Sequence, residues 1–289
     1  MLPPLLLDVF LWLGPRLSAY PLFKSLLDLL NSPDMLEALG PTQAQQMDAL
    51  QKLVDQAGQA FNLFWWLSPS LLGVPGLMAG SPAEKTPAGL PVVWPISSGL
   101  AYFGLFVLLN LLGLGVAAMY WSVLSSRVRE LPIGAERTLA LWWGLFKVAI
   151  LLTIVALIVG LPTLLVATVV SLFSLVAGQF VVMLGGSLLL WALFYMIYTI
   201  HGIALRDLVV LQSIRASVTL MRAQFLPAMS LIVVSVGIYI GTGFLWNIPP
   251  SDSWLRAAGI LGHAFTVTGL YAATALFYMD RTKPETGNQ

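Results

Sequence analysis

The sequence predicts an all-α, polytopic membrane protein with five clear spanning helices and a small external helical cap. Hydrophobic residues make up 58% of the chain and charged residues only 9%, whereas ordinary soluble domains carry about 25% charged residues. A helix that crosses a bilayer needs about 20 apolar residues. Five stretches meet this requirement, namely residues 98–124, 139–160, 181–204, 225–246 and 257–279.

The first stretch, residues 1–13, is apolar but interrupted by Pro3, Pro4 and Asp8. Twelve residues rise about 18 Å in a helix, which is less than the roughly 30 Å of the hydrocarbon layer. No basic segment precedes it and no small-residue cleavage site follows, so it does not fit a secretory signal. It is either an interfacial helix or a truncated span whose first half would precede Met1, and the topology derived below favours the truncated span.

Residues 14–96 have the only soluble-like composition, and they predict an external helical cap followed by a loop. Thr42 and Gln45 form a capping box. Behind this box, Val54 and Phe61 belong to an apolar stripe at helical spacing. Residues 74–95 are rich in proline and glycine, which is typical of a loop. A segment of this size buries only a marginal core by itself, which favours a cap resting on the membrane over an independent ligand-binding domain.

Between the second and third clear spans lies a further apolar run, residues 163–177. Leu161–Pro162 precedes it and Gly178–Gln179 follows it, and both pairs are typical helix breakers. The sequence therefore predicts a broken or re-entrant segment here rather than a separate crossing.

Basic residues orient the chain in the bilayer. Short loops rich in lysine and arginine stay in the cytoplasm. Three basic clusters are present, and they comprise Arg127, Arg129 and Arg137, then Arg206, Arg215 and Arg222, then Arg281 and Lys283. We therefore expect a multi-pass protein of the cell membrane with residues 14–96 external, the spanning bundle at residues 97–281, and a cytoplasmic tail at residues 282–289.

Residues 206–224 predict a cytoplasmic amphipathic helix. Leu211, Val218 and Met221 recur at helical spacing on one side. The three arginines of this stretch are candidates for contact with lipid headgroups, because a helix of this kind lies in the membrane interface; they are Arg206, Arg215 and Arg222. The simpler alternative is a cytoplasmic extension of the neighbouring span, packed on its own bundle.

Four polar residues fall inside apolar segments: Asn110, Lys147, His201 and His263. Asn110 and His263 are expected to make hydrogen bonds between helices, and His201 is expected at headgroup level. Lys147 is either a functional intramembrane charge or a side chain that reaches back to the interface near Trp142 and Trp143.

No catalytic, metal-binding or cofactor-binding pattern is found in the sequence. The histidines lie on different spans without carboxylates at helical spacing, and cysteine is absent. The net charge of +1 argues against a nucleic-acid partner. Gly237 and Gly241 form a Gly-x-x-x-Gly pair that predicts close packing between helices.

Two short motifs carry a resemblance to a known family. Ala216, Ser217 and Arg222 precede the penultimate span and Phe225 begins it. An aromatic, an acidic and a basic residue close the last span; they are Tyr278, Asp280 and Arg281. Over residues 139–281 the chain resembles the membrane domain found beside glycerophosphodiester phosphodiesterases, and related stand-alone bacterial membrane proteins. The catalytic domain of that family is absent, so the resemblance implies a membrane module and no enzyme activity.

Two classes of function remain. The first is a non-catalytic integral membrane protein, a scaffold or accessory subunit, whose partners are membrane lipids and other membrane proteins. The second is a transporter or permease-like subunit in which residues 163–179 form a broken helix along a path, because transporters often carry discontinuous helices. The absence of a matching break or internal repeat favours the first class.

Overall fold

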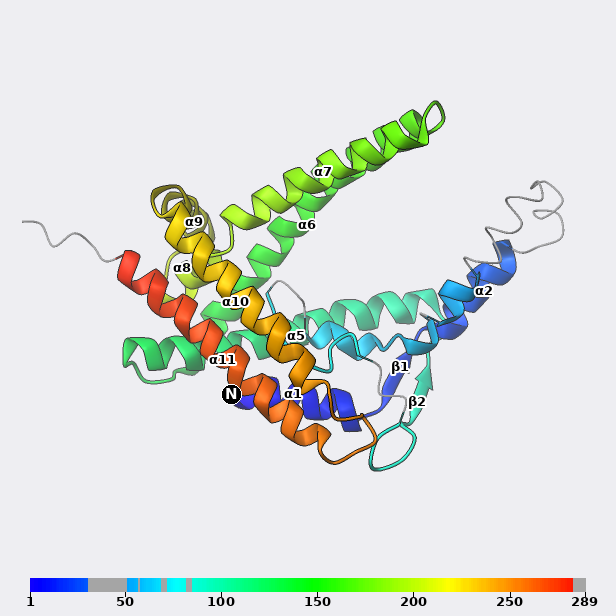
Figure 1. Cartoon of the computed structure of the whole chain (residues 1–289), viewed down its shortest axis with the longest axis horizontal. Coiled ribbons are helices and arrows are strands. Elements are labelled where there is room, and N and C mark those ends of the chain that lie inside the picture. The colour runs from blue at the N-terminus through cyan, green and yellow to red at the C-terminus, as the bar shows by residue number, and fades with distance from the viewer. Residues whose placement is uncertain (31–50, 57, 69–71, 82–84, 283–289) are drawn as a thin grey trace, which may run out of the picture. The chain divides into compact units, whose positions relative to one another are not determined.

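The computed structural model describes residues 1–30, 51–56, 58–68, 72–81 and 85–282 (Figure 1). The expected capping box at Thr42 and Gln45 lies outside the described residues. Helices account for 77% of the described residues, which confirms the all-α class. The elements in chain order are α1 (Leu2–Leu13), β1 (Arg16–Ser18), α2 (Tyr20–Leu30), η1 (Leu63–Leu67), β2 (Val93–Pro95), α5 (Gly99–Arg129), α6 (Ala135–Ser171), α7 (Leu175–Tyr195), α8 (Thr199–Arg206), α9 (Val210–Ala223), α10 (Phe225–Trp246) and α11 (Arg256–Arg281).

Five helical segments within the described residues are long and apolar enough to cross a membrane: Gly99–Arg129, Ala135–Ser171, Leu175–Arg206, Phe225–Trp246 and Arg256–Arg281. They agree with the five spans expected from the sequence, so the prediction of a multi-pass helical membrane protein is confirmed. The chain divides into two compact units. Unit 1 comprises residues 1–117 and 238–268, and unit 2 comprises residues 118–237 and 269–289.

The expected break after residue 160 is wrong. Helix α6 runs without interruption through Pro162 to Ser171, and the chain turns only at residues 172–174. Proline lacks the N–H that would close one helical hydrogen bond, but such a loss is tolerated in spanning helices because neighbouring groups satisfy the freed backbone. Thr163, the next residue, donates its hydroxyl to the Val159 carbonyl at 2.7 Å. Ser174 then caps α7 by accepting a hydrogen bond from the Ala177 N–H.

Helices α6 and α7 lie side by side as an antiparallel hairpin (Figure 1). Small residues at the contact let the two backbones approach closely. A Cβ added at Gly178 would overlap the Ser171 side chain, and one added at Gly185 would overlap Thr163. Gly178 therefore packs a helix rather than breaking one. The outer faces of the hairpin are apolar and exposed, as is required of a surface that meets lipid.

Unit 1 holds the cap around a small core. Strand β1 pairs in parallel with β2, with Arg16 opposite Val93, so the segment expected as loop contains a short strand. The buried residues of this core are Leu17, Leu63, Ile96 and Leu109. Asn62 fixes the local chain path, because its side-chain oxygen accepts hydrogen bonds from the Leu17 N–H at 3.0 Å and the Phe64 N–H at 3.2 Å.

Helix α1 is held to the rest of unit 1 by buried polar contacts. The Asp8 carboxylate is fully buried and accepts hydrogen bonds from the Leu77 N–H at 2.9 Å and the Met78 N–H at 2.8 Å. The Trp12 indole donates to the Ser251 carbonyl at 2.7 Å. Residues 77–78 of the cap and the turn between α10 and α11 thus both contact α1, which supports one common side for the cap and this turn.

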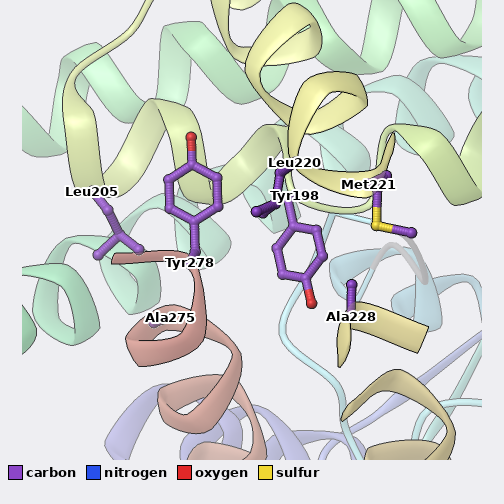
Figure 2. Packing of buried hydrophobic residues seen from close by; sticks show 7 residues of the cluster. All are labelled: Tyr198, Leu205, Leu220, Met221, Ala228, Ala275 and Tyr278. Atoms are coloured by element: carbon purple, nitrogen blue, oxygen red, sulfur yellow. The ribbon is translucent and has the colours of Figure 1, made fainter. Parts of the chain in front are cut away.

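Unit 2 is organised around the turn from α7 into α8 and α9. Its core comprises Tyr198, Leu205, Leu220, Met221, Ala228, Ala275 and Tyr278 (Figure 2). The helix expected over residues 206–224 is shorter: α8 ends at Arg206, and α9 begins at Val210. Asp207 separates the two helices in a left-handed conformation, with φ at 53°. Short polar side chains such as that of aspartate adopt this conformation more readily than most others.

Candidate functional site

The break between α8 and α9 places a carboxylate among arginines of unit 2. One Asp207 oxygen lies 2.7 Å from Arg129 on α5, and the other lies 3.7 Å from the Arg137 Nε on α6. The Asp207 side chain is 55% exposed, whereas the two arginine side chains are 20% and 18% exposed. The contacts therefore join three elements at one point, with the arginines partly enclosed and the carboxylate near the surface.

Arg137 is held mainly by uncharged oxygen atoms. Its guanidinium donates to the Ala204 carbonyl at 2.7 Å, to the Ser125 hydroxyl at 3.1 Å and to the Ser126 hydroxyl at 3.3 Å. Both serines are buried. A planar guanidinium presents five donors in a fixed fork, which matches these acceptors on two neighbouring helices. The arginine thereby fixes the start of α6 against α5 and α8.

Arg206 ties the same end of unit 2 to the last helix. Its guanidinium donates to the Thr282 carbonyl at 2.9 Å and the Met279 carbonyl at 3.3 Å. The end of α11, which carries Arg281, therefore lies beside α8. Arg206 therefore joins α8 to the end of α11 within unit 2.

A cleft of about 200 Å³ opens beside this cluster. Its lining comprises Arg137, Ala140, Leu141, Trp143, Gly144, Lys147, Ile203, Asp207, Leu208, Val209 and Val210. Lys147 reaches back along α6, with its amine 5.4 Å from the centre of the Trp143 ring. This position agrees with the interpretation that the lysine stem extends toward the helix end. Among the described residues, no carboxylate lies within ion-pair distance of this amine.

The cleft therefore combines two cations with an apolar wall. Asp207 offsets part of the charge of Arg137 but is shared with Arg129, so the lining retains a positive excess. An arginine, a lysine and an indole ring are the side chains that suit an anionic group at a membrane surface. No group of three or more His, Asp or Glu side chains able to hold a metal ion occurs within the part of the chain that the structure describes.

The two arginines of α9, Arg215 and Arg222, are both exposed, as a headgroup contact requires. The face that α9 buries agrees with the expected one at Met221 but not at Leu211. Ser213, Ser217, Leu220 and Met221 are buried, whereas Leu211 is 60% exposed.

Close backbone contact explains the choice of the serine face. The Ser217 hydroxyl donates to the Tyr195 carbonyl at 2.7 Å and accepts from the Tyr198 N–H at 3.1 Å. It thus satisfies two backbone groups at the α7–α8 turn, which leucine cannot do. Gly202 brings α8 close to Ser213, since an added Cβ there would lie 2.9 Å from the serine oxygen.

Two of the intramembrane polar candidates have surroundings that differ from those expected. Asn110 donates to the Phe106 carbonyl of its own helix at 2.8 Å, so this bond does not join two helices. His201 is buried among side chains of unit 2, so it is not an exposed polar tip, and its depth at headgroup level stays a prediction. Its Nε2 lies 3.0 Å from the Thr274 hydroxyl, and its ring centre lies 5.0 Å from that of Trp121 and 5.1 Å from that of Tyr198. The structure therefore gives both residues roles in local packing.

The remaining candidates lie in α10 and α11. His263 is 2% exposed, and neither ring nitrogen has a hydrogen-bond partner among the described residues, so the expected interhelical bond is not formed. Among the described residues, no atom lies within 4 Å of a Cβ built on Gly237 or Gly241, so the pair makes no close helix contact there. Its role in packing between helices stays a prediction.

Three residues of the cluster were not site candidates from the sequence alone: Arg129, Arg137 and Asp207. The arginines were used only to orient the chain. A charged aspartate directly after Arg206, between two apolar helical patterns, was the available signal for a helix end with a functional side chain. Spacing along the sequence does not reveal that residues 129, 137 and 207 meet.

Comparison of the chain with protein-family models, curated proteins and solved structures found no match in any of the three. The fold and the cleft therefore define the class of protein by themselves. It is a multi-pass helical membrane protein with a basic cleft at one end of unit 2.

Proposed function

We propose that this protein is a non-catalytic integral membrane protein of the cell membrane, a scaffold or accessory subunit, whose cleft in unit 2 holds an anionic lipid headgroup. The observation that carries the proposal is Lys147. It lies on the edge of a cleft that also contains the Arg137 guanidinium, and it has no carboxylate partner among the described residues. A cation at membrane depth is costly unless it meets an anion or water.

The proposed ligand group is a phosphate. Phosphate is the anion that phospholipids present at the depth where basic interfacial residues lie. The apolar wall of the cleft, which includes Leu141 and Ile203, suits the glycerol backbone and the first carbons of the acyl chains. The positive-inside rule places this end of unit 2 in the cytoplasm, with the C-terminus also inside and residues 14–96 outside.

The resemblance to the membrane module of the glycerophosphodiester phosphodiesterase family forms part of this proposal. Ser217 and Tyr278, two residues of its motifs, are both buried in unit 2. Ser217 satisfies the α7–α8 turn, and Tyr278 packs against Tyr198 with ring centres 6.0 Å apart. A motif that builds the fold near a lipid-facing cleft is consistent with a module that positions lipid or a partner subunit.

The observation that favoured a transporter-like subunit is not found in the structure. Such a subunit required a broken helix at residues 163–179, and α6 is continuous to Ser171. A tight turn then leads directly into α7. No second function is proposed.

Lipid retention tests the headgroup site. The protein is purified in nanodiscs made from equal parts of phosphatidylglycerol and phosphatidylcholine, and the bound lipid is measured by native mass spectrometry. Each basic residue near an anionic lipid contributes about 1 kcal/mol, so K147Q should weaken phosphatidylglycerol retention about fivefold. K147R should retain it. R127Q is the matched control, because Arg127 is an exposed cation that neither lines the cleft nor belongs to the headgroup candidates of α9. Equal retention by wild type and K147Q would refute the headgroup site.

The accessory role requires a separate measurement. Native mass spectrometry of the protein extracted from its own membranes should show a fixed stoichiometry with a second membrane protein. A particle that contains only this chain and lipid under the mildest extraction would contradict the scaffold role, whatever the outcome for Lys147.

A further inference from the structure

Unit 1 contains a second cleft, of about 250 Å³, that is chemically different from the first. Its lining comprises Gly76, Leu77 and Ala79 of the cap, Tyr239, Ile240, Gly243, Phe244 and Asn247 of α10 and its end, and His263 of α11. The space suits a small headgroup rather than a whole lipid.

His263 is the unusual member of this lining. It is 2% exposed, and both ring nitrogens are buried without a hydrogen-bond partner among the described residues. A neutral imidazole carries one N–H donor and one acceptor, and leaving such groups unsatisfied in an apolar interior destabilises the fold. Its one ring neighbour on α10 is Tyr239, whose centre lies 5.6 Å away in an edge-on arrangement. A packed core position of this kind would be filled more favourably by phenylalanine or leucine.

The side-chain amide of Asn247, another polar group of the lining, is already engaged. The Asn247 side chain accepts from Arg256 at 2.6 Å and donates to the Gly243 carbonyl at 2.8 Å. Arg256 and the Asp8 carboxylate lie outside the lining, and both are occupied by other partners. No ionised side chain is therefore among the described residues that line the cleft, and a charged ligand would find no counter-ion.

The rim of the cleft is apolar and open. Phe244 is 76% exposed and Ile240 is 52% exposed, and both belong to α10, which is long and apolar enough to cross the membrane. A molecule dissolved in the hydrocarbon layer would reach the cleft past these side chains. Ligand sites commonly combine such an apolar lining with a few polar groups that fix orientation.

We infer that this cleft binds the head of an uncharged, lipid-soluble molecule whose oxygen atom forms a hydrogen bond with the His263 ring. The rest of the molecule lies along the exposed face of α10. Two kinds of lipid carry this chemistry, a diacylglycerol with its hydroxyl and ester oxygens, and a quinone with its ring carbonyls. The aromatic rings of Tyr239 and Phe244 suit either head.

The first experiment blocks the cleft. The purified full-length protein in nanodiscs is irradiated with a photoactivatable diacylglycerol or a photoactivatable quinone, and the labelled peptides are quantified by mass spectrometry. G243L should reduce labelling at least tenfold, because a side chain there fills the cleft without meeting any atom within 4 Å of its Cβ. G237L is the matched control, since Gly237 is equally open on the same helix but does not line the cleft. Labelling of G237L by either probe should equal that of the wild type.

The second experiment tests the hydrogen bond. H263F keeps an aromatic ring of similar size and should weaken binding about tenfold, whereas H263Q retains a donor and an acceptor and should stay within about threefold of the wild type. The probe that labels the protein shows whether the bound molecule is a diacylglycerol or a quinone. Failure of both probes to label residues 76–79 or 239–247 would overturn the inference, as would equal labelling of wild type and G243L.

This result is independent of the headgroup site in unit 2. K147Q should leave labelling by both uncharged probes unchanged, because Lys147 does not line this cleft. Loss of phosphatidylglycerol retention without loss of labelling, or the reverse, would separate the two sites.

Discussion

Arg137 offers a direct test of what holds the basic end of unit 2 together. Its guanidinium donates to one carbonyl and two serine hydroxyls, and it lies 3.7 Å from Asp207. A hydrogen bond to a charged group contributes about 1.5–3 kcal/mol when its partners are buried. An ion pair at an exposed carboxylate contributes only about 0–1 kcal/mol, and Asp207 is 55% exposed. The uncharged acceptors should therefore dominate.

The comparison of two variants distinguishes these contributions. R137K keeps the positive charge but replaces the planar guanidinium, whose N–H groups reach several acceptors at once, by a compact ammonium group. The free energy of unfolding should fall by roughly 2–4 kcal/mol, because at least one buried acceptor loses its hydrogen-bond donor. D207N removes the carboxylate but keeps a residue that tolerates the left-handed backbone. The free energy of unfolding of D207N should be lower than that of the wild type by at most about 1 kcal/mol. For a chain of this size, each kcal/mol lost from the free energy of unfolding lowers the midpoint temperature of thermal unfolding by roughly 2–4 °C.

Thermal unfolding in nanodiscs, followed by intrinsic tryptophan fluorescence, measures both changes. We expect the unfolding midpoint to fall by about 4–16 °C for R137K and by less than about 4 °C for D207N. R222K serves as the control, because Arg222 is exposed on α9, and its midpoint should not change. A D207N midpoint as low as that of R137K, recovering with added salt, would show that the ion pair dominates and would refute this reasoning.

Three further predictions concern other parts of the chain. G185A should lower the unfolding midpoint because its Cβ would overlap the Thr163 side chain, whereas G186A meets open space and should be silent. In impermeant-thiol labelling of intact cells, D252C should react and T219C should not; both residues are exposed, and labelling of T219C from outside would refute the orientation. D8N should lower the unfolding midpoint, because its amide nitrogen cannot accept the hydrogen bond that one Asp8 carboxylate oxygen accepts from the Leu77 or Met78 N–H.

Burial also decides which positions can report topology. The sequence suggests Ser126 and Ser213 as cytoplasmic reporter sites between apolar segments. In the structure they are 2% and 0% exposed, because both pack at the junction of α5, α6, α8 and α9. A thiol at either position would be shielded whichever side of the membrane it faced. Exposed positions on the same elements are therefore required.

The sequence by itself determined the class of protein and the number of long apolar helices. Both follow from composition and length, because a bilayer requires about 20 apolar residues for each crossing whatever the rest of the chain does. The basic clusters likewise predict one common side of the membrane, and this stays a prediction that thiol labelling tests.

Only the tertiary structure decided where polar side chains find partners. Proline and glycine between residues 160 and 179 predicted a break, yet α6 is continuous. The reason is that a local breaker signal is overridden when a neighbouring helix packs closely on small residues, as at Gly178 and Gly185. The buried serine face of α9 was missed for a similar reason, since hydropathy scores serine as polar while the structure uses Ser217 to satisfy a turn.

The two clefts are likewise products of tertiary structure. Lys147 and His263 could be singled out from the sequence because charged and titratable groups are rare in spanning segments. Their surroundings could not, because the lining residues come from segments far apart in the chain, such as residues 76–79 and 239–247 in unit 1. Spacing along one helix fixes which residues share a face, whereas the identity of the opposite wall depends on how the helices pack.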